Sequence, residues 1–125
     1  ADIATIDVSF ISQTYIIPGL KNILRDKGLF VSLIKPQFEA GREAVGRGGI
    51  VRDNKYHIAS IKKVIECARQ SGFGCLGVIR SPVLGGDGNT EYLAAFVFGE
   101  DLIPPGDGAP RRLLEITATG KGDMT

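Results

Sequence analysis

The feature that most constrains the fold of this chain is a short apolar run near its start, at residues 3–8. The run is rich in β-branched side chains and lacks the alternation of polar and apolar residues that a half-exposed strand shows. Such a run is typical of a strand in a parallel sheet, where helices cover both faces. We therefore expect the chain to fold around a sheet in which this first strand is buried.

Further apolar runs have the length of strands, and two stretches between them have helical character. Ser12 is placed to cap a helix that reaches about Lys27, and Asp53 or Asn54 is placed to cap a second helix. Gly28 and Gly72 follow these stretches, at the position where glycine commonly ends a helix. The expected strands are residues 3–8, 29–34, 75–79 and 92–98.

Each expected helix has one diagnostic feature. Pro18 lies in the first, so we expect its first turn to be irregular. The second carries an apolar stripe at helical spacing, formed by Ile58, Ile61, Ile65 and Ala68. Residues 37–52 separate the second strand from this helix and are expected to form a loop. Loops of such length are more often functional than idle.

The order of elements is strand, helix, strand, helix, strand, strand. Strands joined through a helix are expected to run parallel, with right-handed crossovers. The last two strands are joined without a helix, so the fourth is expected to run antiparallel to the third. The predicted fold class is α/β: the end of a doubly wound sheet, with three parallel strands plus one antiparallel strand and flanking helices.

Residues 99–125 differ in composition from the rest, since they hold three of the six prolines and five glycines. We expect a partly disordered tail after a folded unit of residues 1–98, with only residues 113–117 able to form a strand. The chain also begins directly with an apparent internal strand and without Met. We interpret it as a fragment of a longer protein.

Charge and hydropathy narrow the function classes. The net charge is +1, but residues 21–69 hold eleven Lys and Arg against five Asp and Glu, a local balance of +6. This segment is compatible with a phosphate-bearing partner, and equally with a solvated helix face. No apolar run approaches the roughly 18 residues of a membrane span, and no signal peptide is recognisable. We expect no membrane association.

The thiols and the histidine give no metal motif. Cys67 and Cys75 lack the spacing of a metal site or of a redox motif, and His57 is the only histidine. We expect no metal, and two free thiols that suit a reducing cytoplasm.

Three charged residues are expected at one rim of the sheet. Asp7 lies near the end of the first strand, Lys35 ends the second, and Glu91 begins the antiparallel fourth. Ligands of open α/β sheets bind at the carboxyl ends of the parallel strands. Singly, these residues are explained as a turn cap, a solvated strand end and a rim charge. Together they form a candidate site.

Four separated motifs occur in order: TIDVSFIS at residues 5–12, IKPQFEAGR at 34–42, GGIVRD at 48–53 and GNTEYL at 88–93. They resemble the TlyA family, hemolysin-A-like proteins with an FtsJ-type rRNA methyltransferase domain. The resemblance runs from about Asp2 to Phe98. It implies that the chain is the C-terminal half of a Rossmann-like methyltransferase sheet.

The resemblance also implies an activity, the transfer of a methyl group from S-adenosylmethionine to a ribose 2′-hydroxyl of ribosomal RNA. Asp7, Lys35 and Glu91 match the second, third and fourth members of the Lys-Asp-Lys-Glu tetrad of FtsJ-type enzymes. The first lysine and the main cofactor site would lie upstream of Ala1, with Asp7 and Val8 adjacent to the cofactor. The family's small N-terminal RNA-binding domain is also missing from these residues.

A basic loop is the candidate RNA contact. Arg42, Arg47 and Arg52 would grip phosphates, and Gly46, Gly48 and Gly49 would let the loop approach the RNA backbone closely. The alternative is an ordinary flexible loop whose arginines meet solvent.

Three functions follow in order of preference. The first is an rRNA ribose methyltransferase when complete, acting on ribosomal RNA or a ribosomal subunit in the cytoplasm, with this stretch inactive and free of cofactor when alone. The second is a non-catalytic module that binds RNA or a protein, and the third is a cytolysin. We further expect the exposed edge of the first strand to pair two chains as a homodimer, or to be covered by residues 113–117.

Overall fold

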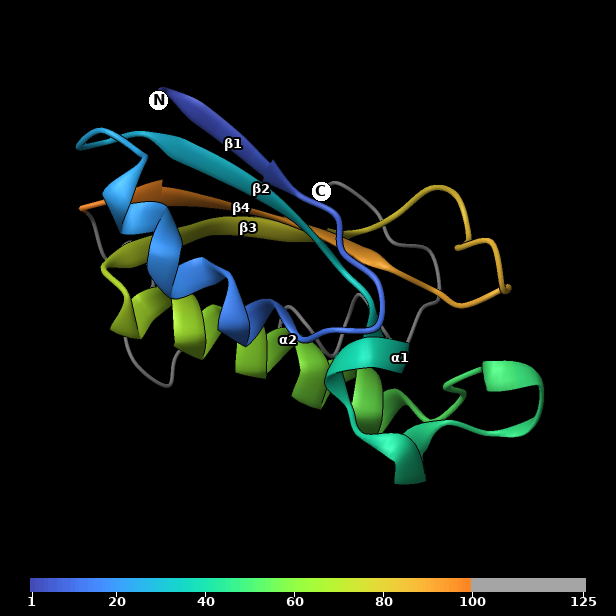
Figure 1. Cartoon of the computed structure of the whole chain (residues 1–125). Coiled ribbons are helices and arrows are strands. Elements are labelled where there is room, and N and C mark those ends of the chain that lie inside the picture. The colour runs from blue at the N-terminus through green and yellow to red at the C-terminus, as the bar shows by residue number, and fades with distance from the viewer. Residues whose placement is uncertain (100–125) are drawn as a thin grey trace.

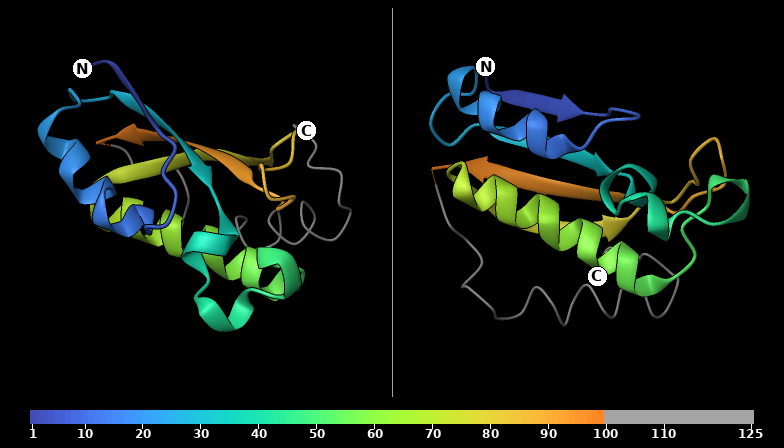
Figure 2. Two further views of the ribbon diagram at one scale, coloured as in Figure 1. Left: turned by 45° about the vertical axis from the view of Figure 1, so that its right-hand side comes forward. Right: turned by 60° about the horizontal axis from the view of Figure 1, so that its bottom comes forward.

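The computed structural model describes residues 1–99, which form a four-stranded sheet with helices against one of its faces (Figures 1 and 2). The strands are β1 (Ile3–Ile6), β2 (Leu29–Ile34), β3 (Phe73–Arg80) and β4 (Tyr92–Phe98). The α-helices are α1 (Pro36–Glu39) and α2 (Asn54–Gln70). Four 3₁₀ turns complete the order: η1 (Gln13–Tyr15), η2 (Ile17–Asn22), η3 (Arg42–Ala44) and η4 (Arg47–Gly49).

The strands lie in the order β1-β2-β4-β3. β1 and β2 are parallel, and β4 is antiparallel to both β2 and β3. The first three strands therefore point the same way, as predicted, but only one pair of neighbours is parallel, because β4 inserts between β2 and β3. The fold is mixed α/β. The Rossmann-like relation, and the assignment to the C-terminal half of the family's domain, stay predictions.

β1 is an edge strand within the described residues. It is shorter than the predicted residues 3–8, and Ile3 is 63% exposed. The expectation of a strand buried on both faces is wrong for the described residues, because their helices cover only one face of the sheet and Ile3 and Thr5 are exposed on the other. Pairing of two chains along this edge stays a prediction.

The predicted helix from Ser12 to about Lys27 is not an α-helix. Its first part forms η1, where the Ser12 side chain accepts from the Thr14 N–H as the expected cap. Pro18 then lies at the start of η2, where hydrogen bonds span three residues, as from Gly19 N to Ile16 O and from Ile23 N to Leu20 O. Proline has no N–H to donate and its ring crowds the preceding turn, so the chain adopts short 3₁₀ turns.

α2 begins and ends as predicted, but its buried face is shifted. Asp53 is the N-cap and accepts from the Lys55 N–H, and Gly72 follows the C-terminus at φ 95°. The buried side chains are His57, Ser60, Ile61, Val64 and Ala68, whereas Ile58 and Ile65 are only partly buried. The stripe therefore lies one residue toward the N-terminus, because His57 bonds to Val51 and Tyr92 and packs inward, while Ser60 donates to the Tyr56 backbone oxygen of its own helix.

The core lies between α2, the turns η1 and η2, and one face of the sheet (Figure 2). Three phenylalanines from three strands form its centre. Phe30 stacks on Phe96 with ring centroids 4.6 Å apart and meets Phe73 edge-on at 4.8 Å. Truncating one such ring to alanine typically costs about 3–5 kcal/mol, so these contacts fix β2, β3 and β4 to one another.

Residues 37–52 are more ordered than the predicted loop, since they contain most of α1 and all of η3 and η4. Cys67 lies on α2 and Cys75 on β3, as predicted, and these two residues form no disulfide with each other. The expected tail and its candidate strand at residues 113–117 lie outside the described residues, apart from Gly99.

Candidate active site

The structure brings the three rim residues to one edge of the sheet. Ile6 of β1 is level with Ser32 of β2, and Ile34 at the end of β2 is opposite Tyr92 at the start of β4. Lys35 directly follows Ile34, and Glu91 directly precedes Tyr92. Asp7, Lys35 and Glu91 therefore emerge beside one another, at the end of the molecule that also carries α1 and the loop of residues 81–90 (Figure 2).

Lys35 is held by a carboxylate. Its Nζ lies 2.6 Å from Asp7 Oδ1, and Ser9 Oγ accepts from the same Nζ at 3.3 Å. The lysine side chain is 13% exposed and that of Asp7 is 65% exposed, so the lysine is mostly buried while the aspartate faces solvent. This contact fixes the direction of the lysine and leaves the aspartate accessible.

Glu91 is buried and makes a different contact. It is 6% exposed, and its Oε2 accepts from Gln37 Nε2 at 3.0 Å. No ion pair joins it to Lys35 within residues 1–99, so of the two flanking carboxylates only Asp7 contacts the lysine. A Cβ at Gly85 would collide with the Glu91 carboxylate, so a larger residue there would have to displace this group.

Gln37 has a further property. Its amide nitrogen faces the Glu91 carboxylate, which leaves its Oε1 buried and without a hydrogen-bond partner among the described residues. A buried carbonyl without a partner costs about 1–3 kcal/mol, and such groups are commonly satisfied by ordered water. The orientation of the amide follows from the charge it meets, because only the NH₂ group can donate to a carboxylate.

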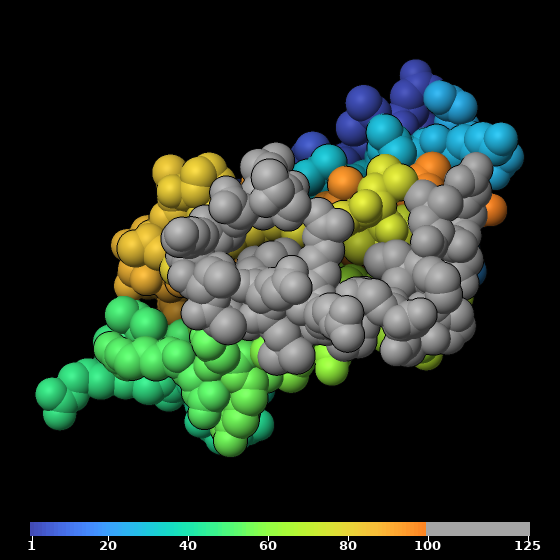
Figure 3. Space-filling view, turned by 180° about the vertical axis from the view of Figure 1, so that it is seen from behind, coloured from blue at the N-terminus to red at the C-terminus, as the bar shows by residue number. Residues whose placement is uncertain are grey.

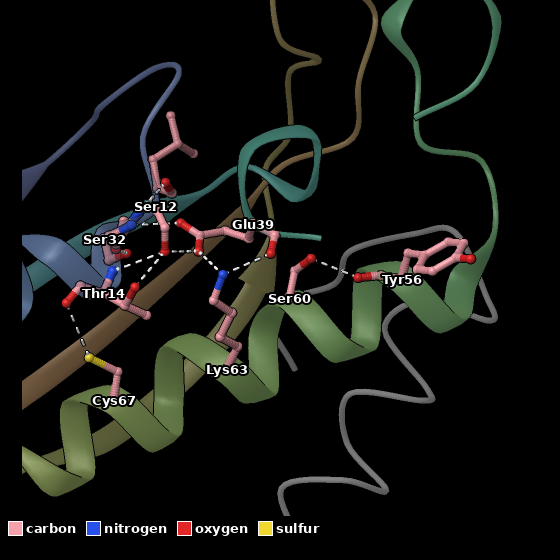
Figure 4. A network of polar contacts seen from close by, with 10 residues as sticks. Ser12, Thr14, Ser32, Glu39, Tyr56, Ser60, Lys63 and Cys67 are labelled. Carbon is pink, nitrogen blue, oxygen red and sulfur yellow. Dashed lines mark hydrogen bonds and ion pairs between the residues drawn. The ribbon is translucent and has the colours of Figure 1, made fainter. Parts of the chain in front are cut away.

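The helix that carries these groups is anchored by Glu39 (Figure 4). Lys35 is the N-cap of α1, and Gln37 lies in its single turn. The buried Glu39 carboxylate accepts from Ser12 Oγ at 2.6 Å and from Gln13 N at 2.8 Å. Hydrogen bonds to charged groups contribute about 1.5–3 kcal/mol each, so these contacts stabilise α1 against η1.

A lysine from α2 completes this anchor. Lys63 Nζ lies 3.4 Å from Glu39 Oε1 and donates to the Glu39 backbone oxygen at 2.9 Å. The buried carboxylate is thereby paired as well as hydrogen-bonded, which is the condition under which a buried charge is tolerated. The position of Lys35 is consequently set by contacts to η1 and to α2.

The predicted arginine loop stands out at the same end of the molecule. Figure 3 shows the segment around residues 40–52 projecting from the body, beside the loop of residues 81–90. Arg42, Arg47 and Arg52 are exposed, and Arg52 Nη1 donates to the Arg47 backbone oxygen at 3.1 Å. Gly48 and Gly49 have φ of 75° and 77°, a region in which other residues are strained. The loop is thus shaped by hydrogen bonds and presents its guanidinium groups outward.

Asp87 lies in the loop that covers Glu91. Burial acts to raise its pKa, but hydrogen bonds from Asn89 and its own backbone, together with the charge of Lys35, lower the pKa below its ordinary value. Gly85 of the same loop lies against the Glu91 carboxylate, so the loop reaches the site.

Several residues of the site were not predicted from sequence. Ser9 contacts Lys35, Gln37 contacts Glu91, and Asn89 and His57 are buried behind them. The signal for Asn89 was its position within the GNTEYL motif, two residues before Glu91. The lone His57 was considered only as a metal ligand, although its position on α2 was compatible with a buried hydrogen-bonding role.

Residues 1–99 contain neither a metal site nor a membrane-spanning helix. No group of three or more His, Cys, Asp or Glu side chains is arranged to hold a metal ion. No helix in this part of the chain has the length and apolar character needed to cross a membrane.

Comparison with known proteins identifies the class. The FtsJ-like methyltransferase family matches residues 1–98, so the chain belongs to that family. The Bacillus subtilis protein "Putative rRNA methyltransferase YqxC" is 50% identical over 92 residues, which are 74% of this chain and 33% of that protein. Hemolysin A of Brachyspira hyodysenteriae is 45% identical over 95 residues, or 73% of this chain and 38% of that protein.

Two further comparisons agree with this family assignment. One is a relative with a more specific name, and the other is a solved structure. The 16S/23S rRNA (cytidine-2′-O)-methyltransferase TlyA of Mycobacterium tuberculosis is 38% identical over 91 residues, or 73% of this chain and 34% of that protein. The structure described as "Putative hemolysin from Streptococcus thermophilus" has a TM-score of 0.84 and 43% identity, covering 94% of this chain and 42% of that one. The chain thus spans about a third of the length of the curated relatives it matches. The predicted resemblance to this family is confirmed.

The phenol next to Glu91 leads to a prediction about pH. Burial raises the pKa of Tyr92 from 10.0 to about 12, although the charge of Arg80 lowers it in part. Because the pKa is higher in the folded than in the unfolded chain, its contribution to stability is complete below pH 10 and is lost as the pH rises through about 12. In an alkaline titration followed by phenolate absorbance, one of the three tyrosines should ionise late.

The control for this titration is Tyr92→Phe, which should remove the late phase alone. Circular dichroism of the same samples shows whether the chain is folded at each pH. Ionisation of all three tyrosines near pH 10 in the folded chain would contradict the burial of Tyr92.

Proposed function

We propose that the protein containing this chain is an S-adenosylmethionine-dependent rRNA ribose 2′-O-methyltransferase of the cytoplasm. The observation that carries this proposal is the Lys35–Asp7 pair of 2.6 Å, held at the same sheet edge as the buried Glu91. Membership of the FtsJ-like family supports methyl transfer. Relatives named as rRNA methyltransferases, one of them a cytidine-2′-O enzyme, support a ribose of ribosomal RNA as the substrate.

Lys35 acts on the hydroxyl to be methylated. A ribose hydroxyl is a weak nucleophile at neutral pH, so it must be oriented and its proton must leave as the new O–CH₃ bond forms. Lys35 Nζ orients the oxygen. As an ammonium it stabilises the negative charge that develops on this oxygen, and after it has released its own proton it can accept the proton of the hydroxyl. Asp7 and Ser9 hold Nζ in place, and Asp7 is open to solvent on the side where a ligand can approach.

Glu91 and Gln37 form the buried side of the site. Glu91 is a buried negative charge on the strand next to Lys35, and Gln37 sets the direction of its carboxylate. Fixed charges in a site with little water stabilise charge that develops during reaction better than solvent does. Because the transfer is in-line between oxygen and methyl carbon, positioning of the hydroxyl supplies much of the rate.

The described residues do not by themselves form a cradle for S-adenosylmethionine. The glycine-rich turn at residues 85–88 is closed against Glu91 and Asp87, and the glycines at 48 and 49 lie in the projecting arginine loop. Neither opens a helix at the end of a parallel strand, the arrangement in which a glycine-rich loop binds a nucleotide cofactor. We therefore assign this chain to the side of the reaction that holds the ribose hydroxyl.

The principal alternative is a non-catalytic module that binds RNA through the arginine loop. The exposed Arg42, Arg47 and Arg52 serve both functions equally well. A module has no need for a lysine paired with an aspartate beside a buried glutamate, so substitution of Lys35 separates the two.

We predict that Lys35→Ala in the protein containing this chain lowers kcat for RNA methylation by about 10²–10⁴-fold, since the hydroxyl loses the group that orients it. Transfer of a labelled methyl group to rRNA measures this. Lys62→Ala, which removes an exposed lysine of α2, is the matched control and should keep full activity. Normal activity of the Lys35 variant would remove this residue from the site, and RNA binding without any methyl transfer by the wild type would favour the module.

A second prediction concerns the arginine loop. Changing Arg42, Arg47 and Arg52 together to Ala should weaken RNA binding and reduce the slope of log affinity against log salt by about two, as expected for three lost phosphate contacts. Fluorescence anisotropy at several salt concentrations measures both quantities. The control changes Lys21, Arg25 and Lys62 to Ala, which removes the same charge from other surfaces. If the two triple variants weaken RNA binding equally, the arginine loop contributes only through the net charge of the protein and is not a specific RNA contact.

A third prediction concerns the chain alone. Because the described residues lack a cofactor cradle, isothermal titration of these 125 residues with S-adenosylmethionine should give no binding heat, and the chain should be inactive. The longer protein that contains the chain is the positive control. Micromolar or tighter binding by the chain alone would show that the cofactor site lies within it.

A further inference from the structure

Both polar groups of one peptide residue, Val51, are held by buried side chains. Its N–H donates to Asn89 Oδ1 at 2.9 Å, and its carbonyl oxygen accepts from His57 Nε2 at 2.7 Å. Val51 is 2% exposed, Asn89 0% and His57 5%. Val51 directly precedes Arg52 and follows the glycine pair of the arginine loop, so this loop is fixed to the body of the molecule at its C-terminal end.

Asn89 ties two loops together. Besides accepting from Val51, its Nδ2 donates to the Gly49 backbone oxygen at 2.8 Å. Its own backbone oxygen accepts from Gly85 N at 2.9 Å, and its N–H donates to Asp87 Oδ1 at 3.0 Å. Asn89 therefore closes the turn that covers Glu91 and also hydrogen-bonds to the arginine loop.

His57 makes the second connection. Since a carbonyl can only accept, His57 Nε2 carries the hydrogen that Val51 receives, and the neutral ring then accepts at Nδ1 from the Tyr92 hydroxyl, 2.9 Å away. One tautomer satisfies both partners. The 1% exposed Tyr92 is the first residue of β4 and the direct neighbour of Glu91.

The residues on either side of Glu91 thus converge on the same peptide. Asn89, two residues before Glu91, binds the Val51 N–H, and Tyr92, one residue after it, reaches the Val51 carbonyl through His57. We name Asn89, His57 and Tyr92 the Val51 clamp. Both side-chain amide atoms of Asn89 and both ring nitrogens of His57 have partners, and a buried polar network satisfied in this way favours one arrangement of the groups it joins.

We propose that Asn89 and His57 are positioning residues that couple the RNA held by the arginine loop to Glu91. The inference rests on the function proposed above and assigns roles to two residues that do not touch the reacting atoms. The clamp makes the arginine loop and the start of β4 one rigid unit, so a phosphate bound at Arg52 is placed at a fixed distance from the site. A displacement of about 1 Å in such an arrangement can lower the rate about 10²-fold.

The clamp itself is tested on this chain without any RNA. Amide hydrogen exchange should show strong protection of the Val51 N–H in the wild type and loss of that protection in Asn89→Ala. His57→Gln, which retains a donor for the Val51 carbonyl, should keep more protection than His57→Ala. Rapid exchange of the Val51 N–H in the wild type, or equal protection in all variants, would overturn the clamp.

The coupling is tested by kinetics on the protein that contains the chain, with rates expressed per folded molecule. Asn89→Ala should raise KM for RNA and lower kcat together, each about tenfold or more, because it separates the two parts of the site. The arginine variants should mainly raise KM, and Glu91→Gln should mainly lower kcat. His57→Gln should recover part of what His57→Ala loses.

Val64→Ala is the matched control, since it destabilises the buried face of α2 away from the clamp and should leave both constants per folded molecule unchanged. If Asn89→Ala changes neither constant, or only one, the coupling is wrong even though the enzyme is active. If the wild-type protein methylates no RNA, the proposed function fails, while the exchange measurement still decides whether the clamp exists.

Discussion

The arrangement of this protein depends on the antiparallel insertion of β4 between β2 and β3. β4 bonds to both neighbours along its length, and Phe30, Phe73 and Phe96 lock the three strands through ring contacts. Because β4 runs against β2, its first residues lie where β2 ends. Glu91 and Lys35 become neighbours for this reason alone, and β1, parallel to β2, brings Asp7 to the same edge. Without the insertion Glu91 would still lie at this edge of the sheet, because that follows from strand direction, but it would not begin the strand next to β2.

Buried polar side chains then fix what the sheet has brought together. Glu39 anchors α1 to η1 and to Lys63 of α2, and α1 in turn carries Lys35 and Gln37. Asn89 and His57 do the same for the loops on the other side of the site. In each case the buried group has its hydrogen-bond partners, which is the condition for a polar residue to stabilise a unique arrangement rather than to weaken it. The site is open toward solvent at Asp7 and closed behind Glu91.

Local patterns predicted much of the fold. The bounds of β2, β4 and α2, the Ser12 and Asp53 caps and the glycine after α2 followed from apolar run length and from capping chemistry. The prediction of an α-helix from Ser12 to about Lys27 was wrong because Pro18 and the surrounding turns favour 3₁₀ geometry. The stripe predicted on α2 was wrong in part because hydropathy alone placed Ile58 and Ile65 inside, whereas His57 has buried hydrogen-bond partners in Val51 and Tyr92 and therefore packs inward. The exposure of β1 could not be read from its composition, since burial depends on which neighbours are present.

The sequence by itself determined the strands, the direction of each relative to the next and the family, because these depend on local composition and on motifs. It also placed Asp7, Lys35 and Glu91 at one rim, which follows from strand direction. Only the tertiary structure decided that Lys35 pairs with Asp7 while Glu91 is held by Gln37, and that Val51 joins the two loops. The contacts of Lys35 with Asp7, of Gln37 with Glu91 and of Val51 with Asn89 link residues 28 to 54 positions apart (35 − 7 = 28 for the first). Their partners depend on strand order and side-chain direction, which no local pattern in the chain encodes.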